Sequence, residues 1–285
     1  MRLLGGWPDA SGQRRKYCIL CYTHAHPMPL SVIVITRNES ANISDCLQSV
    51  DFADEILVLD HASTDRTADM ARSLGARVSV TPDWPGFGPQ KNRALDLANG
   101  DWVLSIDADE RVTPELREEI LKSISQPGTV ICFSIPRSSW FCGQFMRHSG
   151  WTPDYVDRLF KKGFARFSDD LVHERLLHDG PCQRLNSPLL HYSYRDFSEV
   201  LQKVDRYSTA SARQAFAAGR RASIFTAVGH GLWAFLRTYV FRAGFLDGSR
   251  GLALAVCSAE GSYYRYLKLW LMQEQDKINH GSVGR

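Results

Sequence analysis

The chain of 285 residues is 44% hydrophobic and 23% charged, which is the composition of an ordinary globular protein. Its net charge of +3 argues against binding to nucleic acid through bulk charge, and its length suits one large domain or one domain with an appendage. The seven cysteines form an odd, scattered set, which indicates free thiols in a reducing compartment rather than a disulfide framework.

The first part of the chain carries few structural signals. Residues 1–27 show neither periodicity nor the apolar core of a signal peptide. The pattern C-x2-C-x2-H-x-H from Cys18 to His26 leaves too little chain between the ligand pairs for a usual zinc finger. We interpret residues 1–28 as an N-terminal extension that is disordered or not native, because Met28 leads directly into a predicted strand.

Strands and helices alternate after this extension. Continuous apolar runs such as LSVIVIT predict buried strands, which lie at 30–36, 55–60, 76–80 and 102–106. Helices are predicted between and after them, at 41–50, from a cap at Ser63 or Thr64 to Gly75, at 90–98, and after Thr113-Pro114. Alternation at this spacing is typical of βαβ units, so we expect an α/β fold with a mostly parallel sheet.

The pattern loosens after residue 130. Short strands are predicted at 130–137, 155–160, 165–167 and 189–194, and the sequence becomes largely helical from Asp196 onward. These patterns divide the remaining chain into an α/β domain over residues 29–195 and a helical region over residues 196–285.

Three predicted strands end in polar residues, which are Thr36, Asn38, Glu39, Asp60, Asp107 and Asp109. Strand residues two apart share a face, so Asp107 and Asp109 repel each other unless a cation or a group of donors lies between them. A solvated acidic turn is the alternative, but it does not explain why three strand ends meet at the edge where parallel sheets bind ligands. No G-x-G-x-x-G follows the first strand, which argues against a dinucleotide-binding dehydrogenase.

The ordered motifs LSVIVITRNE, LDHASTDRT, QKNRAL and SIDADE resemble glycosyltransferase family 2, whose GT-A fold is Rossmann-like. WTPDYVDRLFKK, LVHERL, LLHYSY and RAGFLDGSRGL are similar to lipopolysaccharide core β-glucosyltransferases of the WaaE/KdtX type. The resemblance covers residues 29–270 and implies that the α/β domain is catalytic. It also implies inverting transfer of a sugar, with glucose expected, from a nucleoside-diphosphate sugar to a lipopolysaccharide core or other glycan. A UDP-sugar is the favoured donor.

The resemblance also implies roles for the polar residues. Asp109 would hold Mg²⁺ or Mn²⁺ at the diphosphate, where departure of the leaving group needs its charge neutralised, and Asp107 would lie nearer the ribose. The nucleotide-sugar site would include Thr36, Asn38, Glu39, Asp60, Lys91, Arg93 and Asp107. A turn-capping role for Asp60 and a solvated helix face for Lys91 and Arg93 remain the alternatives. The family usually has glycine where this chain has Ala62. Glycine allows a close approach of the backbone to a ligand, so the resemblance does not define how the nucleotide binds at this position.

The acceptor hydroxyl must lose a proton during the transfer, which calls for a general base. We predict Glu174 of VHERL for this role, with Asp169 and Asp170 as rivals. An ion pair between Glu174 and Arg175 or another cation is the alternative. Two other functions remain open: a polyprenyl-phosphate glycosyltransferase, and a catalytically silent protein that binds nucleotide sugars.

The segment 223–246 is apolar and aromatic but is interrupted by Arg237 and Arg242. Its uncharged part is short for a membrane span. Arginines among apolar residues fit a helix that lies on an anionic membrane surface, while a helix in a core or dimer interface is the alternative. With the family resemblance, this segment predicts a peripheral enzyme on the cytoplasmic face of the bacterial inner membrane, where a lipid-linked acceptor is expected.

Overall fold

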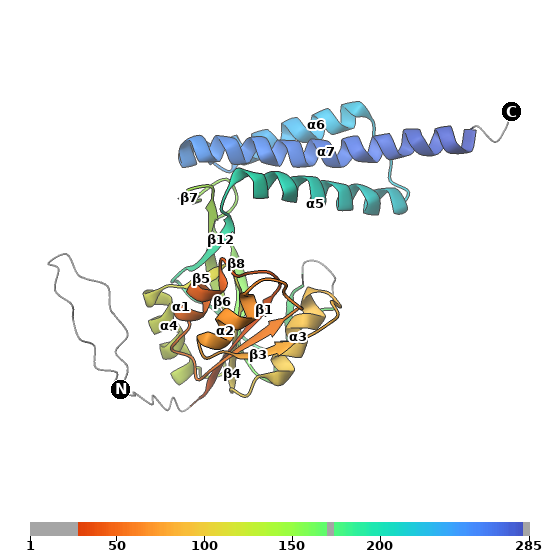
Figure 1. The fold of residues 1–285 in the computed structure, drawn as a ribbon. Coiled ribbons are helices and arrows are strands. Elements are labelled where there is room, and N and C mark those ends of the chain that lie inside the picture. Colours follow the sequence, from red (N-terminus) through yellow and green to blue (C-terminus); the bar gives the residue numbers. More distant parts are fainter. Residues whose placement is uncertain (1–27, 170–173, 282–285) are drawn as a thin grey trace.

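The structure, a computed structural model, describes residues 28–169 and 174–281, so residues 1–27 of the predicted extension lie outside it. The first half of the sheet consists of the parallel strands β1 (Leu30–Thr36), β2 (Glu55–Asp60), β3 (Arg77–Val80) and β4 (Trp102–Asp107). Their order is β3-β2-β1-β4, with Thr36 opposite Asp60 and Ile35 opposite Asp107. This register brings the ends of β1, β2 and β4 to one edge, and the predicted α/β fold with a mostly parallel sheet is confirmed (Figure 1).

Both faces of this sheet are covered. The covering helices are α1 (Ile43–Ser49), α2 (Thr67–Ser73), α3 (Phe87–Leu97) and α4 (Pro114–Ser125). Val32 and Val34 of β1 pack into the apolar layer that contains residues of α1, α2 and α4, while Ile33 and Ile35 pack into the layer with α3. A strand that is buried on both faces favours apolar side chains on both, which explains the nearly continuous apolar run in LSVIVIT.

The second half of the domain extends the sheet with mixed pairing. β8 (Tyr155–Lys161) runs antiparallel between β4 and β6 (Cys132–Phe141), and β12 (Leu189–Tyr194) follows between β6 and β5 (Glu110–Val112). Two further short strands, β7 (Gln144–Phe145) and β11 (Cys182–Arg184), also pair with β6. β9 (Ala165–Phe167) and β10 (Leu176–His178) form a separate two-stranded sheet. Because β12 lies next to β5, it reaches the same edge as the acidic end of β4.

Several predicted elements need correction. The predicted cap of α2 at Ser63 or Thr64 is wrong, because the helix begins at Thr67, and the carboxylate of Asp65 accepts hydrogen bonds from the Thr67 amide and hydroxyl. α3 begins at Phe87, three residues before the predicted start at residue 90, because Pro89 is tolerated in a first helical turn. The predicted Thr113 cap of α4 is confirmed by a hydrogen bond from the Leu116 amide to its hydroxyl.

The helical region lies above the α/β domain in Figure 1. It consists of α5 (Phe197–Ala217), α6 (Ile224–Leu236), the π-helical turn η1 (Arg237–Phe241), the 3-10 turn η2 (Gly244–Asp247) and α7 (Gly248–Gly281). Buried Asp247 accepts hydrogen bonds from the amides of Arg147 and His148 and from the hydroxyl of Ser149, which joins this region to the segment after β7. Within residues 28–169 and 174–281, no helix has the length and apolar character needed to cross a membrane.

Candidate active site

Asp107 at the end of β4 lies between two buried cations. Its Oδ1 is 3.0 Å from Nζ of Lys91 on α3, and its Oδ2 accepts a 2.5 Å hydrogen bond from Nη2 of Arg158 on β8. Burial alone would raise the pKa of this carboxyl, but Arg158 and Lys91 lower the pKa well below its usual range. Asp107 is therefore an anion that both cations hold in place.

Glu110 ties this network to the backbone. It is fully buried, and one of its carboxylate oxygens accepts a 3.0 Å hydrogen bond from Arg158, while the other accepts a 2.9 Å bond from the Asp107 amide. Burial alone would lower the pKa of the Arg158 guanidinium, but the charges of Asp107 and Glu110 raise it. These contacts fix the turn after β4, which carries Asp109.

Asp109 contacts a histidine from the C-terminal part of the α/β domain. Its Oδ2 lies 3.4 Å from Nε2 of His191 on β12, and the Asp109 carbonyl accepts a hydrogen bond from the Tyr192 amide. Nδ1 of His191 contacts the hydroxyls of Ser193 at 2.9 Å and Ser139 at 3.2 Å, which holds the ring. The pair offers one oxygen and one nitrogen donor side by side, a set that can hold a divalent metal ion.

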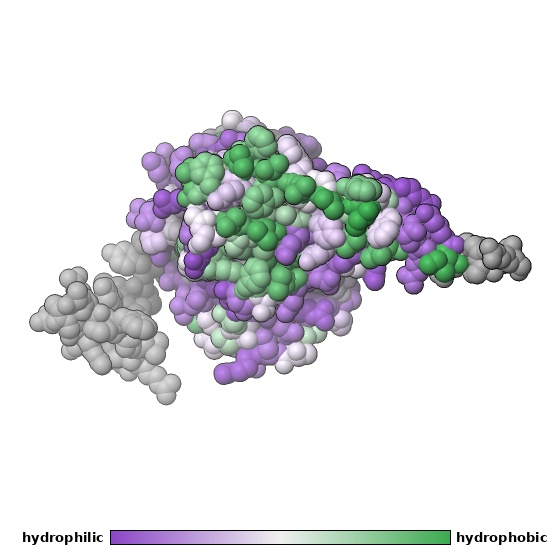
Figure 2. Space-filling model, turned by 90° about the horizontal axis from the view of Figure 1, so that it is seen from above, coloured by the Kyte–Doolittle hydropathy of each residue, from purple (hydrophilic) through white to green (hydrophobic). Residues whose placement is uncertain are grey.

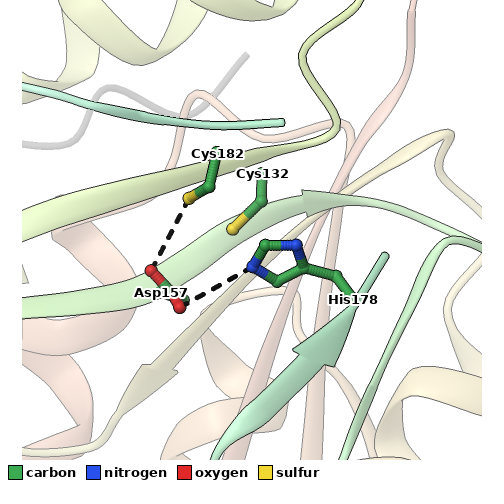
Figure 3. A group of neighbouring side chains, drawn as sticks. All are labelled: Cys132, Asp157, His178 and Cys182. Carbon is green, nitrogen blue, oxygen red and sulfur yellow. Dashed lines mark hydrogen bonds and ion pairs between the residues drawn. The ribbon is translucent and has the colours of Figure 1, made fainter. Parts of the chain in front are cut away.

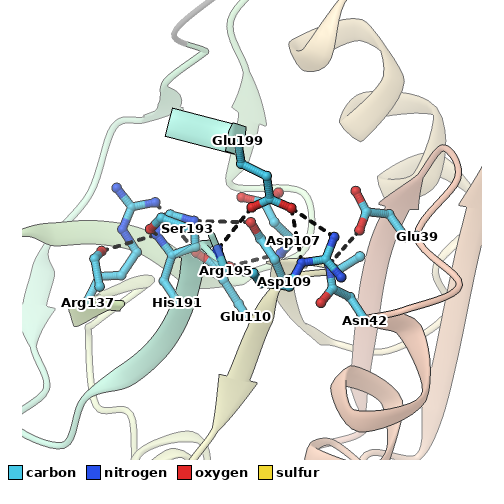
Figure 4. A network of polar contacts seen from close by, with 12 residues as sticks. Glu39, Asn42, Asp107, Asp109, Glu110, Arg137, His191, Ser193, Arg195 and Glu199 are labelled. Carbon is cyan, nitrogen blue, oxygen red and sulfur yellow. Dashed lines mark hydrogen bonds and ion pairs between the residues drawn. The ribbon is translucent and has the colours of Figure 1, made fainter. Parts of the chain in front are cut away.

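Asp109 lines a pocket of about 330 Å³ between the sheet edge and α5, while His191 lines the pocket next to it (Figure 4). The charged lining residues of the first pocket are Glu39, Asp109, Arg195, Glu199, Lys203 and Arg206. Burial raises the pKa of Glu39 and the nearby charge of Asp109 raises it further, while a hydrogen bond from Asn42 opposes this shift. The pocket thus combines carboxylates that suit a cation with basic side chains that suit an anion.

The ends of β1 and β2 are joined by hydrogen bonds. The Thr36 hydroxyl donates to buried Asp60 at 2.9 Å, and Asp60 also accepts from the amide and hydroxyl of Ser63. Asn38 joins the same two loops, since its side-chain oxygen accepts from the Thr64 amide at 2.8 Å. These contacts bring three of the predicted nucleotide-binding residues together, and they also give Asp60 the turn-capping role considered as its alternative.

Ala62 stands where the resemblance calls for glycine. Its φ is +44°, which lies in the left-handed region that glycine favours. The backbone therefore adopts the conformation expected of a glycine, at the cost of local strain in a residue with a Cβ atom.

Lys91 and Glu174 form the second group of predicted residues. Nζ of Lys91 lies 2.7 Å from Oε1 of Glu174, so Glu174 and Asp107 share one buried ammonium group. The ion pair with another cation, considered as the alternative for Glu174, is therefore present. Arg93 instead pairs with Asp83 at the surface, at 2.8 Å.

The structure says less about the two other candidates for the general base. Asp169 is exposed, and Asp170 lies outside the described residues.

A second pocket, of about 370 Å³, adjoins the first and shares Ser193 and Lys203 with it. Trp151, Tyr194 and Tyr207 contribute aromatic surface to its walls. Aromatic faces and basic groups in adjoining pockets suit a sugar that carries negative charge.

Sequence reasoning missed His191, Arg158 and Glu110 as site residues. The motif LLHYSY drew attention to the region of His191, but only the pairing of β12 with β5 sets His191 opposite Glu110 and beside Asp109. Glu110 is the last residue of SIDADE, but its burial beneath Arg158 depends on contacts between distant strands.

Known proteins resemble this chain over most of its length. A model of the family described as Glycosyl transferase family 2 matches residues 31–224. An uncharacterized glycosyltransferase of Rickettsia prowazekii is 30% identical over an alignment of 252 residues, covering 84% of this chain and 86% of the relative. The lipopolysaccharide core biosynthesis glycosyltransferase LpsC of Rhizobium meliloti is 28% identical over 272 residues, covering 89% and 98%. Among solved structures, glucosyl-3-phosphoglycerate synthase of Mycobacterium tuberculosis is 28% identical over 40% of this chain and 44% of its own, with a TM-score of 0.34.

Proposed function

Because this chain belongs to glycosyltransferase family 2 and is a glycosyltransferase, we propose that it moves a sugar from a nucleoside-diphosphate sugar to a glycan acceptor of the lipopolysaccharide core type. The single observation that carries the proposal is the Asp109–His191 pair, which lies at the carboxyl edge of the sheet between two adjoining pockets, one lined by Asp109 and the other by His191. The similarity to LpsC, named for lipopolysaccharide core biosynthesis, supports this class of acceptor. UDP-glucose is the specific donor that we propose.

The nucleotide would lie along the ends of β1, β2 and β4. Thr36, Asn38 and Asp60 form one side of this edge, and Lys91 with Asp107 forms the other. Glu39 belongs to the pocket beyond and faces Asp109. Arg93 is held by Asp83 and is the weakest member of the proposed nucleotide-binding set.

Asp109 and His191 are the residues proposed to hold a divalent ion. Their donor atoms lie 3.4 Å apart; the carboxylate suits Mn²⁺ or Mg²⁺, and the imidazole favours Mn²⁺ of the two. When bound, the ion supplies charge that stabilises the departing diphosphate. Asp107 stays outside the ligand set because Lys91 and Arg158 already engage both of its oxygens.

Glu174 is proposed as the general base that takes the proton of the acceptor hydroxyl. Its side chain is 17% exposed, so solvent or substrate can reach it beside the Lys91 contact. Proton removal during attack on the opposite face of the sugar requires no covalent sugar–enzyme intermediate, so we propose inversion at the anomeric carbon.

The helical region is proposed to rest on an anionic membrane surface. Exposed apolar side chains gather on the face seen from above in Figure 2. The apolar face is defined by exposed residues of α6, η1 and η2: Phe225, Val228, Leu232, Trp233, Leu236, Val240, Phe241, Phe245 and Leu246. Arg237 and Arg242 are exposed in the same segment and suit anionic headgroups. Such contact would hold the protein on the membrane that carries a lipid-linked acceptor, and the proposed location is the cytoplasmic face of the inner membrane.

The deciding experiment measures release of free nucleoside diphosphate from candidate donors in the presence of different acceptors. We expect release with a UDP-sugar and a lipopolysaccharide core acceptor, and no release from Asp109→Asn. Turnover with a polyprenyl phosphate alone would identify the other transferase class. Donor binding without turnover for any acceptor would identify the silent binding protein.

A further inference from the structure

A second group of metal-binding side chains lies outside the candidate active site. It contains Cys132 of β6, Asp157 of β8, His178 of β10 and Cys182 of β11. One donor atom from each side chain lies within 4.8 Å of the other three (Figure 3). These residues come from three separate parts of the sequence, since only His178 and Cys182 are close together, and the fold brings all four side chains to one place.

Strand pairing accounts for the two cysteines. β11 runs parallel to β6, with Cys182 directly opposite Cys132. A thiol on one strand therefore faces a thiol on its neighbour, although the cysteines looked scattered along the sequence.

A β-bulge accounts for Asp157. Phe133 pairs with Leu159 and the next residue, Ser134, pairs with Asp157, so Arg158 is an extra residue in β8. A bulge of this kind redirects side chains. It sends Arg158 to Asp107 while Asp157 turns toward Ser134, whose hydroxyl donates to its carboxylate and lies 3.2 Å from the Cys182 sulfur.

His178 is oriented by a turn of its own segment. Its Nδ1 lies 3.1 Å from the Gly180 carbonyl, which can only accept a hydrogen bond, so Nδ1 carries the proton. The lone pair of Nε2 is then available to bind a metal ion. Nε2 lies 3.9 Å from Asp157 Oδ2. A histidine that binds a metal through one ring nitrogen commonly donates the other N–H to a backbone carbonyl.

The spacing fits a tetrahedral ion. Bond lengths of about 2.0–2.3 Å place the ligand atoms of tetrahedral Zn²⁺ roughly 3.3–3.8 Å apart. The sulfur of Cys182 lies 3.7 Å from Asp157 Oδ1, and Nε2 of His178 lies 3.9 Å from the other oxygen, Oδ2. Both distances are close to the tetrahedral spacing, so a small shift of the carboxylate would present one oxygen to an ion that both partners bind. Two thiolates, an imidazole and a carboxylate are a donor set that favours zinc over magnesium or calcium.

We propose that Cys132, Asp157, His178 and Cys182 form a zinc site that fastens β10 to the central sheet. β10 pairs only with β9 among the described strands, so it lacks backbone hydrogen bonds to that sheet. Glu174 lies two residues before β10 and faces Lys91. The ion would therefore stabilise the segment that carries this carboxylate, at a place separate from Asp109 and His191.

The test is the zinc content of the purified full-length protein, kept reduced and measured by plasma mass spectrometry. We expect about one zinc ion per chain in the wild type and in two controls, Cys142→Ser and Asp109→Asn. Cys182→Ser and His178→Ala should lose it. Co²⁺ added to metal-stripped wild type should produce the thiolate charge-transfer absorption of a tetrahedral site, and Cys182→Ser should lack it. Cys182 is exposed, so its replacement by serine should leave the fold intact.

A second measurement uses the position of Ser134, which touches two of the four proposed ligands. Ser134→Ala should bind zinc about tenfold more weakly in competition with a chelator, because it removes a contact that orients the ligands. Zinc should raise the melting temperature of the wild type and of Cys142→Ser but not of Cys182→Ser. Failure of reduced wild type to bind zinc or Co²⁺, equal zinc in Cys182→Ser, or a native Cys132–Cys182 disulfide would each overturn the proposal.

Discussion

Asp107 and Asp109 are two residues apart, yet their surroundings give them different chemistry. Both oxygens of Asp107 are engaged by buried cations, while the carboxylate of Asp109 lies beside His191 and lines a pocket. Strand alternation predicts that the two carboxylates share an edge, but it cannot say which one remains available to a ligand. That distinction comes from Lys91 and Arg158, which reach β4 from other elements.

The proposed roles of Glu174 and Asp109 predict different kinetic signatures. Glu174→Gln should lower turnover by on the order of 10²–10⁴-fold, because the acceptor hydroxyl then keeps its proton. Its affinity for the nucleotide should stay near normal, since the diphosphate is held elsewhere. Asp109→Asn should lower turnover by at least about 10²-fold and also weaken nucleotide binding in the presence of Mn²⁺. Turnover assays paired with calorimetric titration of the nucleoside diphosphate distinguish the two.

His191→Ala should behave like Asp109→Asn, with lower turnover and weaker nucleotide binding in the presence of Mn²⁺. Near-normal turnover in Glu174→Gln, together with an inactive Asp169→Asn or Asp170→Asn, would move the base to one of its rivals. A product that retains the anomeric configuration of the donor would contradict single displacement.

The environment of Asp107 predicts a pH dependence of stability. Its pKa is lowered in the folded protein by Arg158 and Lys91 against the opposing effect of burial, whereas the unfolded chain should show about 3.9. A depressed pKa adds stability above the unfolded value and loses it as pH falls below that value toward the folded one. Urea unfolding from pH 5 to pH 3 should therefore show a steeper loss of free energy for the wild type than for Asp107→Asn. Parallel slopes would contradict the role of this network.

At the scale of elements, several strands were predictable from local sequence, but three strands of three residues each were not. β1, β2 and β12 have the bounds that the sequence predicts, because their apolar or β-branched runs are long enough to identify. β5, β10 and β11 have only three residues each and depend on neighbours for their strand conformation. The Asp109–His191 pair and the proposed zinc-binding residues both need these short strands, so their assembly could not be predicted from local patterns.

The start of α3 offers a test of how an element positions the site. Gly88 packs against the backbone carbonyl of Ser168, and an added Cβ atom would overlap that oxygen. Since Lys91 lies one turn further along α3, Gly88→Ala should displace the helix from the segment that carries Glu174. We expect a loss of about 1–3 kcal/mol in the free energy of unfolding. Denaturant titration measures it, and turnover should fall in the same variant.

Gly229→Ala is the matched control. Gly229 lies within α6 and has a negative φ, and a methyl group added to its Cα would meet no other atom within 4 Å. Alanine should therefore leave stability unchanged or raise it by about 0.5–1 kcal/mol. A Gly88→Ala protein as stable as wild type would show that the α3 contact tolerates a methyl group and does not fix the position of Lys91.

At the scale of the whole molecule, the pockets and the apolar face lie on opposite sides of the helical region. The pockets border α5 on the side of the α/β domain, and the apolar face is seen from above over α6 (Figures 1 and 2). The sequence left a membrane-surface helix and a core or dimer helix as alternatives. The apolar face does not pack into the core formed by the described residues, since Phe225 is 83% exposed and Leu232 is 64% exposed.

Membrane contact through this face predicts binding that depends on both charge and apolar surface. The wild type should sediment with vesicles that contain anionic lipid and detach as salt rises, because surface attraction is screened within about 10 Å at 0.1 M. Phe225→Asp with Leu232→Asp should abolish sedimentation, whereas Phe164→Asp, at an exposed phenylalanine of the α/β domain, should not. Turnover with a water-soluble acceptor should be the same in all three proteins, since the altered residues lie away from both pockets. A wild type that ignores vesicles but forms a dimer lost in the double variant would assign the apolar face to a second copy of the chain.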